Sequence, residues 1–250
     1  MKNTFRIIGF TLILSMLFLL SNCGKDNMFD CFKSTGKIVV EDRPASEFYG
    51  IILNNNLDLY LTQGTGFSIS VEAGKHLQKG IKTEIRDRVL TISNENRCNW
   101  VRSYEKPMKV YVSFTDLDSL EYKASGNIYS LNTLVSDSIK LVIKEGGGSI
   151  DLHIQTWKSV FQVDEGTVDL TVHGISNVNY ISSNAYGPVD CLDLNTVFTY
   201  MTSSSTNNCY VNTSSVLDVT IENVGNVYYL GNPDSVYFTQ YGSGKLIKLD

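Results

Sequence analysis

The chain has 250 residues and a formal net charge of −5, with 21 basic and 26 acidic residues. Residues 119–250 contain 6 lysines, 13 acidic residues and no arginine. Nucleic-acid affinity comes mainly from neutralising phosphate charge. The composition therefore excludes a nucleic-acid partner and disfavours anionic lipid headgroups.

The start of the chain predicts an exported lipoprotein. A basic start precedes the apolar run 7–20, which is short for a membrane span but has the layout of a secretory signal. Leu20-Ser21-Asn22-Cys23 follows and resembles a bacterial lipobox, with Asn22 in place of the usual small residue. We expect residues 1–22 to be a lipoprotein signal peptide and Cys23 to carry lipid. The alternative is an ordinary signal peptide in which the cysteine is incidental.

Residues 23–35 are expected to be a polar tether between the lipid and the fold. Within it, Gly24-Lys25-Asp26-Asn27 resembles the tag that sends lipoproteins of Bacteroidetes to the cell surface. We therefore expect an outer-membrane lipoprotein that is exposed at the surface and touches the membrane through its lipid anchor only.

Four more cysteines follow Cys23, namely Cys31, Cys98, Cys191 and Cys209. In an exported chain this even number permits two disulfides. Cys191 and Cys209 lie about one repeat apart, so stacking could bring them together, although the repeat alignment places Cys209 nearer the level of Val189. Buried free thiols are the alternative.

Residues 36–118 predict a β-rich N-terminal region. Alternating apolar patterns mark strands at 37–40, 51–61, 67–71, 81–86, 89–93 and 108–114. Turns are expected at 64–66 and 86–88. Helical periodicity is confined to the short, glycine-bounded stretch 74–80, so the mature chain is predicted to be all-β.

Residues 119–250 repeat. Similar starting points recur every 18 to 21 residues, at Ser119, Ser138, Ser159, Asn177, Thr196, Ser215 and Ser235. Most units contain a small-residue break, near Gly126, Gly148, Gly166, Gly187, Gly225 and Gly244. Such a period is typical of a solenoid, whose units bury their apolar faces only against their neighbours. We predict a parallel β-helix-like solenoid of about seven coils, with the glycines near one corner.

Like residues should then stack along the coils, about 4.8 Å apart. Residues at one repeat position, allowing slips of one residue in the alignment, are predicted to face inward and form a column of the core. They are Tyr122, Leu141, Tyr180, Tyr200, Val219 and Phe238.

Three segments carry a family resemblance. Val40-Glu41-Asp42-Arg43-Pro44 with Phe48-Tyr49-Gly50-Ile51, the stretch 56–64, and Ser119-Leu120-Glu121-Tyr122 with the following residues to Asn127 resemble the auto-transporter adhesin "head GIN" family of Bacteroidetes lipoproteins. The resemblance covers about residues 36–250. It implies a fold and, by analogy of name, adhesion, and it implies no catalytic residues.

Asp151, Asp169 and Asp190 each follow the apolar residue after a glycine break, so we expect them to stack on one outer face. Such a column could bind Ca²⁺. The favoured interpretation is a solvated column without metal, because the chain lacks the nonapeptide of calcium-binding β-rolls. The same alignment sets His153 against Thr171, so His153 and His173 are not expected to stack.

Tyrosine is concentrated in the repeats, which contain 10 of the 14 in the chain. Tyr129, Tyr210 and Tyr228 occupy the same repeat position as the aspartates and should face outward. Exposed rings in line with carboxylates suit contact with a glycan or a protein. The alternative is that the tyrosines reflect β-propensity and core filling.

The sequence thus favours a surface-anchored, non-enzymatic, adhesin-like binding module without a cofactor. One alternative is a polysaccharide lyase or hydrolase built on a β-helix, which the missing arginines beyond Arg102 disfavour. Another is a structural envelope lipoprotein.

Overall fold

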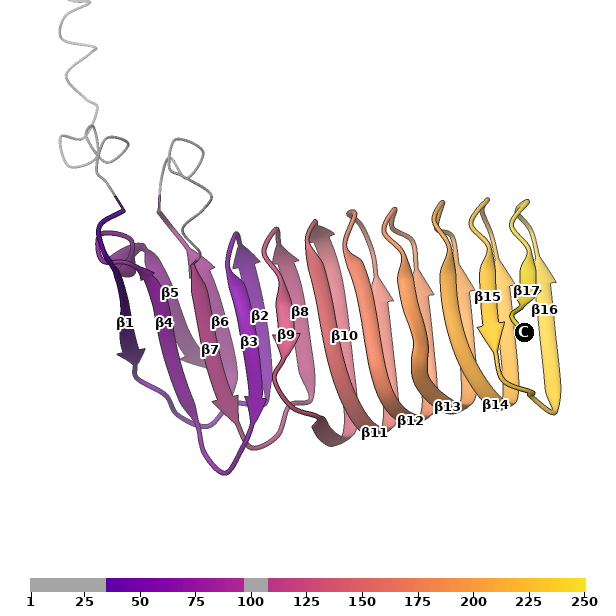
Figure 1. Cartoon of the computed structure of the whole chain (residues 1–250), viewed down its shortest axis with the longest axis horizontal. Helices are drawn as coiled ribbons and strands as arrows, with labels where there is room; N and C mark the ends of the chain where they lie inside the picture. The colour runs from indigo at the N-terminus through magenta and orange to yellow at the C-terminus, as the bar shows by residue number, and fades with distance from the viewer. Residues whose placement is uncertain (1–34, 97–107) are drawn as a thin grey trace, which may run out of the picture.

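The computed structural model describes residues 35–96 and 108–250. The predicted signal peptide, Cys23, Cys31 and Cys98 lie outside these ranges. The described chain is almost entirely β-structure and forms a solenoid of about six turns with a β-rich N-terminal region (Figure 1). This architecture confirms the predicted fold class.

Seventeen strands form one continuous sheet among the described residues. They are β1 (Ile38–Arg43), β2 (Gly50–Asn55), β3 (Asp58–Gln63), β4 (Ser68–Gly74), β5 (Ile81–Arg86), β6 (Val89–Asn94), β7 (Lys109–Phe114), β8 (Ser119–Ala124), β9 (Ile128–Ser130), β10 (Leu134–Gly146), β11 (Ser149–Val163), β12 (Asp169–Ser183), β13 (Val189–Ser203), β14 (Cys209–Ile221), β15 (Val227–Leu230), β16 (Ser235–Gln240) and β17 (Leu246–Lys248). The 3₁₀-helix η2 (Gln78–Gly80) interrupts them.

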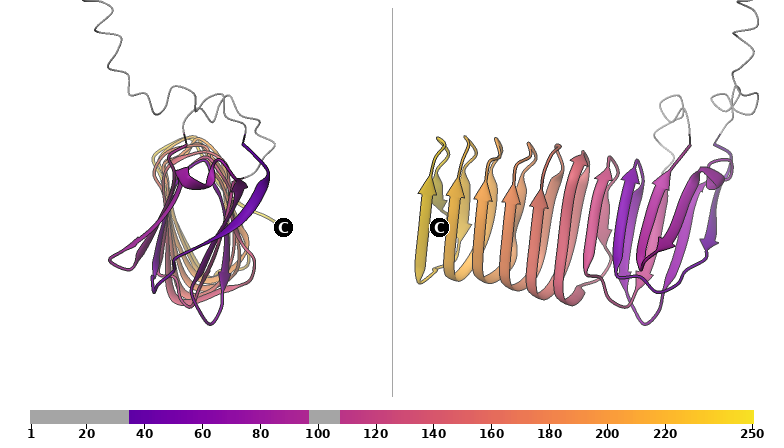
Figure 2. Two further views of the ribbon diagram at one scale, coloured as in Figure 1. Left: turned by 90° about the vertical axis from the view of Figure 1, so that its left-hand side faces the viewer. Right: turned by 180° about the vertical axis from the view of Figure 1, so that it is seen from behind.

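The sheet wraps into a flattened tube with two faces, seen end-on in Figure 2. We call one the β8 face, made of β2, β6, β8, β16 and the second halves of β10–β14. The β9 face contains β3, β7, β9, β15, β17 and the first halves of β11–β14. Each long strand supplies both faces by bending in its middle, where Trp157 of β11 falls outside the paired register. Parallel pairing between successive coils then buries alternate side chains inside the tube.

The N-terminal region adds to the same stack. β2 pairs in parallel with both β6 and β8, and β3 pairs in parallel with both β7 and β9. The β2–β3 unit therefore lies between two coils that come later in the sequence. Beyond it, β1 pairs antiparallel with β4, β4 with β7, and β5 with β6. These antiparallel strands close this end of the tube.

The upper turns in Figure 1 are packed backbone against backbone. A Cβ on Gly244 would lie 2.0 Å from the carbonyl oxygen of Gly225, one coil earlier. At Gly148, φ is +103°, a conformation that favours glycine. Glycines 126, 148, 166, 187, 225 and 244 all meet the turn of a neighbouring coil in this way, which confirms the predicted corner column.

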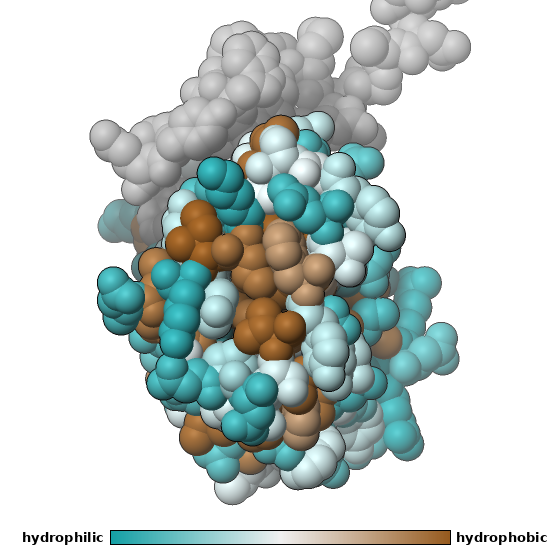
Figure 3. Space-filling view, turned by 90° about the vertical axis from the view of Figure 1, so that its right-hand side faces the viewer, coloured by the Kyte–Doolittle hydropathy of each residue, from teal (hydrophilic) through white to brown (hydrophobic). Residues whose placement is uncertain are grey.

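The other end of the solenoid is open. Val236 and Phe238 of β16 continue the inward columns of Leu217 and Val219, which are fully buried. Within the described chain no further coil packs on this side of β16, and Val236 and Phe238 are 43% and 42% exposed. Figure 3 shows the resulting hydrophobic centre of this end, surrounded by polar side chains.

No helix among residues 35–96 and 108–250 has the length and hydropathy needed to cross a bilayer.

Candidate functional site

One column of outward side chains runs along the β9 face; we call it the outer column. In spatial order it contains Tyr111, Tyr60, Tyr129, Asp151, Thr171, Asp190, Tyr210 and Tyr228. The rings of Tyr60 stack on Tyr111 at 5.0 Å and on Tyr129 at 5.3 Å between centroids, and Tyr210 stacks on Tyr228 at 5.1 Å. The predicted alignment of Tyr129, Tyr210 and Tyr228 with Asp151 and Asp190 is confirmed.

The predicted column of three aspartates is wrong. Asp151 pairs with Thr171, and Thr171 pairs with Asp190, so two coil spacings separate the two carboxylates. Asp169 pairs with Ser149 at the start of β11. The error is a slip of two residues, because Gly166 packs against Gly146 and not at the turn position of Gly148.

The same two-residue error in the predicted alignment had placed His153 and His173 at different levels of the stack. In the structure His153 of β11 and His173 of β12 are direct register partners, and their rings stack with centroids 4.6 Å apart. The prediction that they do not stack is therefore wrong.

The β8 face carries a shallow groove of about 430 Å³. The stacked rings of Tyr180 and Tyr200, with centroids 5.1 Å apart, form its aromatic part. Hydroxyl, amide and carboxylate groups complete its polar lining, from Gln162, Ser182, Thr202, Asp218 and Thr220. Lys158 places its Nζ 5.4 Å from the centroid of Tyr180. The groove thus combines ring edges with many short hydrogen-bonding groups.

The sequence prediction placed Tyr180 and Tyr200 in the core, and this is wrong. Tyr180 pairs with Val160 and Tyr200, whereas the core column at the next position contains Phe161, Ile181 and Met201. Tyr180 is 42% exposed, and Ile181 is 3% exposed. A one-residue slip moves every side chain to the opposite face of a strand.

A sequence signal for this groove existed. Lys140 and Asp218 share the repeat position of Tyr180 and Tyr200. Charged side chains are rarely buried without a partner. Two charges in one column therefore indicate that the whole column faces solvent.

Cys191 and Cys209 are both free and buried. Cys209 pairs with Val189, as the repeat alignment indicated, while Cys191 pairs with Val211. The two thiols thus lie at different levels, and a disulfide between them is contradicted. Burial raises the pKa of both thiols, which keeps them protonated and unreactive.

Residues 47–233 match the family described as "putative auto-transporter adhesin, head GIN domain". No functionally curated protein matches the chain.

Several solved structures share the fold. A putative adhesin from Bacteroides fragilis superposes with a TM-score of 0.78 at 19% identity, over 85% of this chain and 97% of that one. A putative adhesin from Parabacteroides distasonis gives 0.65 at 16% identity, over 86% and 98% of the two chains. A second protein of that species, called a putative lipid binding protein, gives 0.64 at 16% identity, over 87% and 98%.

Proposed function

The chain belongs to the family of putative auto-transporter adhesins with a head GIN domain, and on that premise we propose that it is an adhesin-like module that binds a surface ligand without chemically changing it. The β8-face groove is the observation that carries the proposal. Its chemistry suits a glycan best, because sugars offer hydroxyls to short polar side chains and C–H groups to aromatic rings. A protein ligand is the second candidate.

The electrostatics of the repeats support an uncharged ligand. Residues 119–250 contain 6 basic and 13 acidic residues. An anionic polysaccharide would therefore meet net repulsion along the solenoid, whereas a neutral glycan would not. The alternative of a lyase or hydrolase has no residue-level support in the groove, where Asp218 is the one titratable carboxylate among the lining residues.

A second contact surface is proposed on the β9 face, at Tyr129, Tyr210 and Tyr228. Their stacked, half-buried rings offer edges and hydroxyls outward. Tyr129 and Tyr210 border the part of the outer column formed by Asp151, Thr171 and Asp190. This surface would take a ligand that hydrogen-bonds to hydroxyl and carboxylate groups.

Attachment is proposed through lipid on Cys23, with the tether 23–35 holding the solenoid at the outer-membrane surface. The motif Leu20-Ser21-Asn22-Cys23 after the apolar run supports this location. A surface position would give the groove access to ligands outside the cell.

A glycan-array screen of the purified protein, followed by calorimetry with the best ligand, tests the groove. We expect Tyr200→Ala to weaken binding at least about 30-fold, the effect of losing a hot-spot ring. Tyr186→Ala, at an exposed ring in the turn between β12 and β13 that belongs to neither surface, is the matched control and should change affinity less than about twofold. Loss of affinity in Tyr228→Ala but not in Tyr200→Ala would move the site to the β9 face. If the protein cleaved a polysaccharide and the Asp218→Asn variant lost this activity, the protein would be an enzyme and the binding-module proposal would be wrong.

A further inference from the structure

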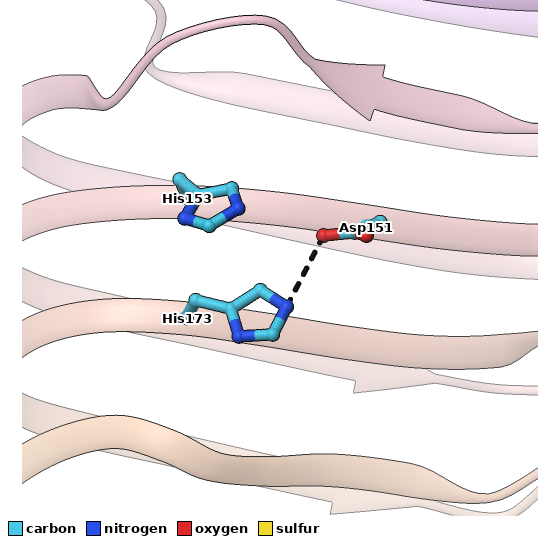
Figure 4. Close-up of side chains that lie close together, drawn as sticks. All are labelled: Asp151, His153 and His173. Carbon is cyan, nitrogen blue, oxygen red and sulfur yellow. Dashed lines mark ion pairs between the residues drawn. The ribbon is translucent and has the colours of Figure 1, made fainter.

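Three side chains with metal-binding chemistry meet on the β9 face. Asp151 and His153 are two residues apart on β11 and therefore point to the same side of the strand. His173 comes from β12, one coil later, and is the register partner of His153. Figure 4 shows both imidazole rings beside the Asp151 carboxylate.

The spacing of their ligand atoms suits a metal ion. The Nε2 atom of His173 lies 3.3 Å from Oδ1 of Asp151. One ligand atom from each of the three side chains lies within 4.8 Å of the others. A tetrahedral zinc site with bonds of about 2.1 Å places its ligand atoms about 3.4 Å apart. One pair already has this spacing, and small side-chain rotations would bring in His153.

The other nitrogen of His173 has the partner that a metal ligand needs. Its Nδ1 atom lies 3.3 Å from Oδ2 of Asp193 on β13. Histidines that bind metals almost always donate their second ring N–H to such a carboxylate, which fixes the tautomer and the ring orientation.

Local backbone irregularities bring Asp193 to His173. The register between β12 and β13 shifts between Thr171 and Gly174. Gly174 has a φ of +112°, and a Cβ there would lie 2.0 Å from the carbonyl oxygen of Ile154. A bulge of this kind commonly redirects a side chain at a functional position.

The Asp151 carboxylate has an unsatisfied oxygen. Its Oδ1 atom is shielded from solvent and accepts no hydrogen bond within the described chain. The contact with His173 Nε2 is close enough for an ion pair but lacks the geometry of a hydrogen bond. An unsatisfied carboxylate oxygen is costly where water does not reach it. The Asp151 side chain is 45% exposed as a whole, so this cost falls on Oδ1 alone, and a cation bound to Oδ1 would relieve it.

We propose that Asp151, His153 and His173 bind one divalent transition-metal ion, represented by Zn²⁺, with Asp193 as the orienting carboxylate. Two imidazoles and one carboxylate favour Zn²⁺ over Ca²⁺, which prefers an all-oxygen shell. Because His153 is exposed, the fourth position of the ion is open to water or to a ligand from outside. Asp151 belongs to the outer column, between Tyr129 and Thr171, and the two histidines lie beside that column, two residues further along β11 and β12.

Isothermal titration of the purified protein with Zn²⁺ alone tests the site. We expect one ion per chain, and at least a tenfold loss of affinity in His153→Gln and in His173→Gln. His76→Gln, at the histidine between β4 and η2, is the matched control and should bind as the wild type does. Asp193→Asn should lower the affinity about 10–100-fold without abolishing binding.

Two results would overturn the proposal. One is equal zinc binding by the wild type and the His153→Gln/His173→Gln double variant, with both folded by circular dichroism. The other is a chain that binds Ca²⁺ but not Zn²⁺. A zinc-edge anomalous difference peak between the two rings in a crystal would locate the ion directly, and this readout does not depend on any ligand in the β8-face groove.

Discussion

Tyr122 lies fully buried beneath the upper turns of two successive coils. Its hydroxyl donates to the carbonyl oxygen of Gly126 at 2.7 Å and also contacts that of Gly147. Both carbonyls belong to turns where the backbone cannot pair as it does within a strand. One buried hydroxyl therefore links two turns, and burial raises the pKa of Tyr122.

Tyr122→Phe should lower the free energy of unfolding by about 1–2 kcal/mol at pH 7, because it leaves buried carbonyls unpaired. The raised pKa means that the wild type is fully stabilised below the pKa of an unfolded tyrosine, about 10, and loses stability as the pH rises above it. The gap between variant and wild type should therefore narrow between pH 9 and pH 11. Urea unfolding at several pH values measures it, and a constant gap would contradict the assignment.

The strands of the solenoid differ in how many neighbouring coils cover their inward side chains, and this depends on their position along the stack. One inward column contains Leu120, Leu141, Phe161, Ile181, Met201, Val219 and Phe238. Its members have neighbours on both sides except at β16. At the opposite end, the antiparallel strands β1, β4 and β5 cover the stack, so its two ends are not equivalent.

Phe161 and Phe238 test this gradient with one residue type in one column. Phe161 is 1% exposed, so Phe161→Ala should cost about 3–5 kcal/mol of unfolding free energy. Phe238 is 42% exposed, so Phe238→Ala should cost only about 1 kcal/mol. Urea denaturation of both variants measures the difference. Equal costs would show that the open end is covered in solution.

At the scale of the whole molecule, an acidic rod carries different chemistry on each face. The β8 face presents the aromatic and hydroxyl-lined groove, and the β9 face presents the outer column with the proposed metal site. Proposed lipid attachment at one end would leave both faces accessible. A ligand would then contact the β8 or the β9 face along the side of the rod. The open end at β16 and β17 lies far along the chain from the tether.

The anchor itself is testable. Cys23→Ser should release the protein from the membrane fraction, because the lipid chains supply the hydrophobic attachment. Cys31→Ser is the matched control from the same segment and should leave the partitioning unchanged. Ultracentrifugation and labelling with a fatty-acid analogue measure both variants. Membrane partitioning of Cys23→Ser equal to that of the wild type would disprove lipid attachment at this position.

The sequence alone determined the all-β class, the repeat and the glycine corner, because each depends on a periodicity that all coils share. It also determined that Tyr129, Tyr210 and Tyr228 share one outward position with Asp151 and Asp190. These residues follow turns whose lengths keep the strands in phase, so simple alignment of the repeats was sufficient.

Only the tertiary structure decided the register within each coil and the neighbours across coils. Side chains alternate with a period of two, so a slip of one residue put Tyr180 in the core instead of the groove. A slip of two, caused by the placement of Gly166, hid the contact between His153 and His173. The insertion of β2 and β3 between later coils depends on pairing between segments far apart in the chain. A local pattern contains no information about such pairing, since the free energy that selects it comes from packing in the complete stack.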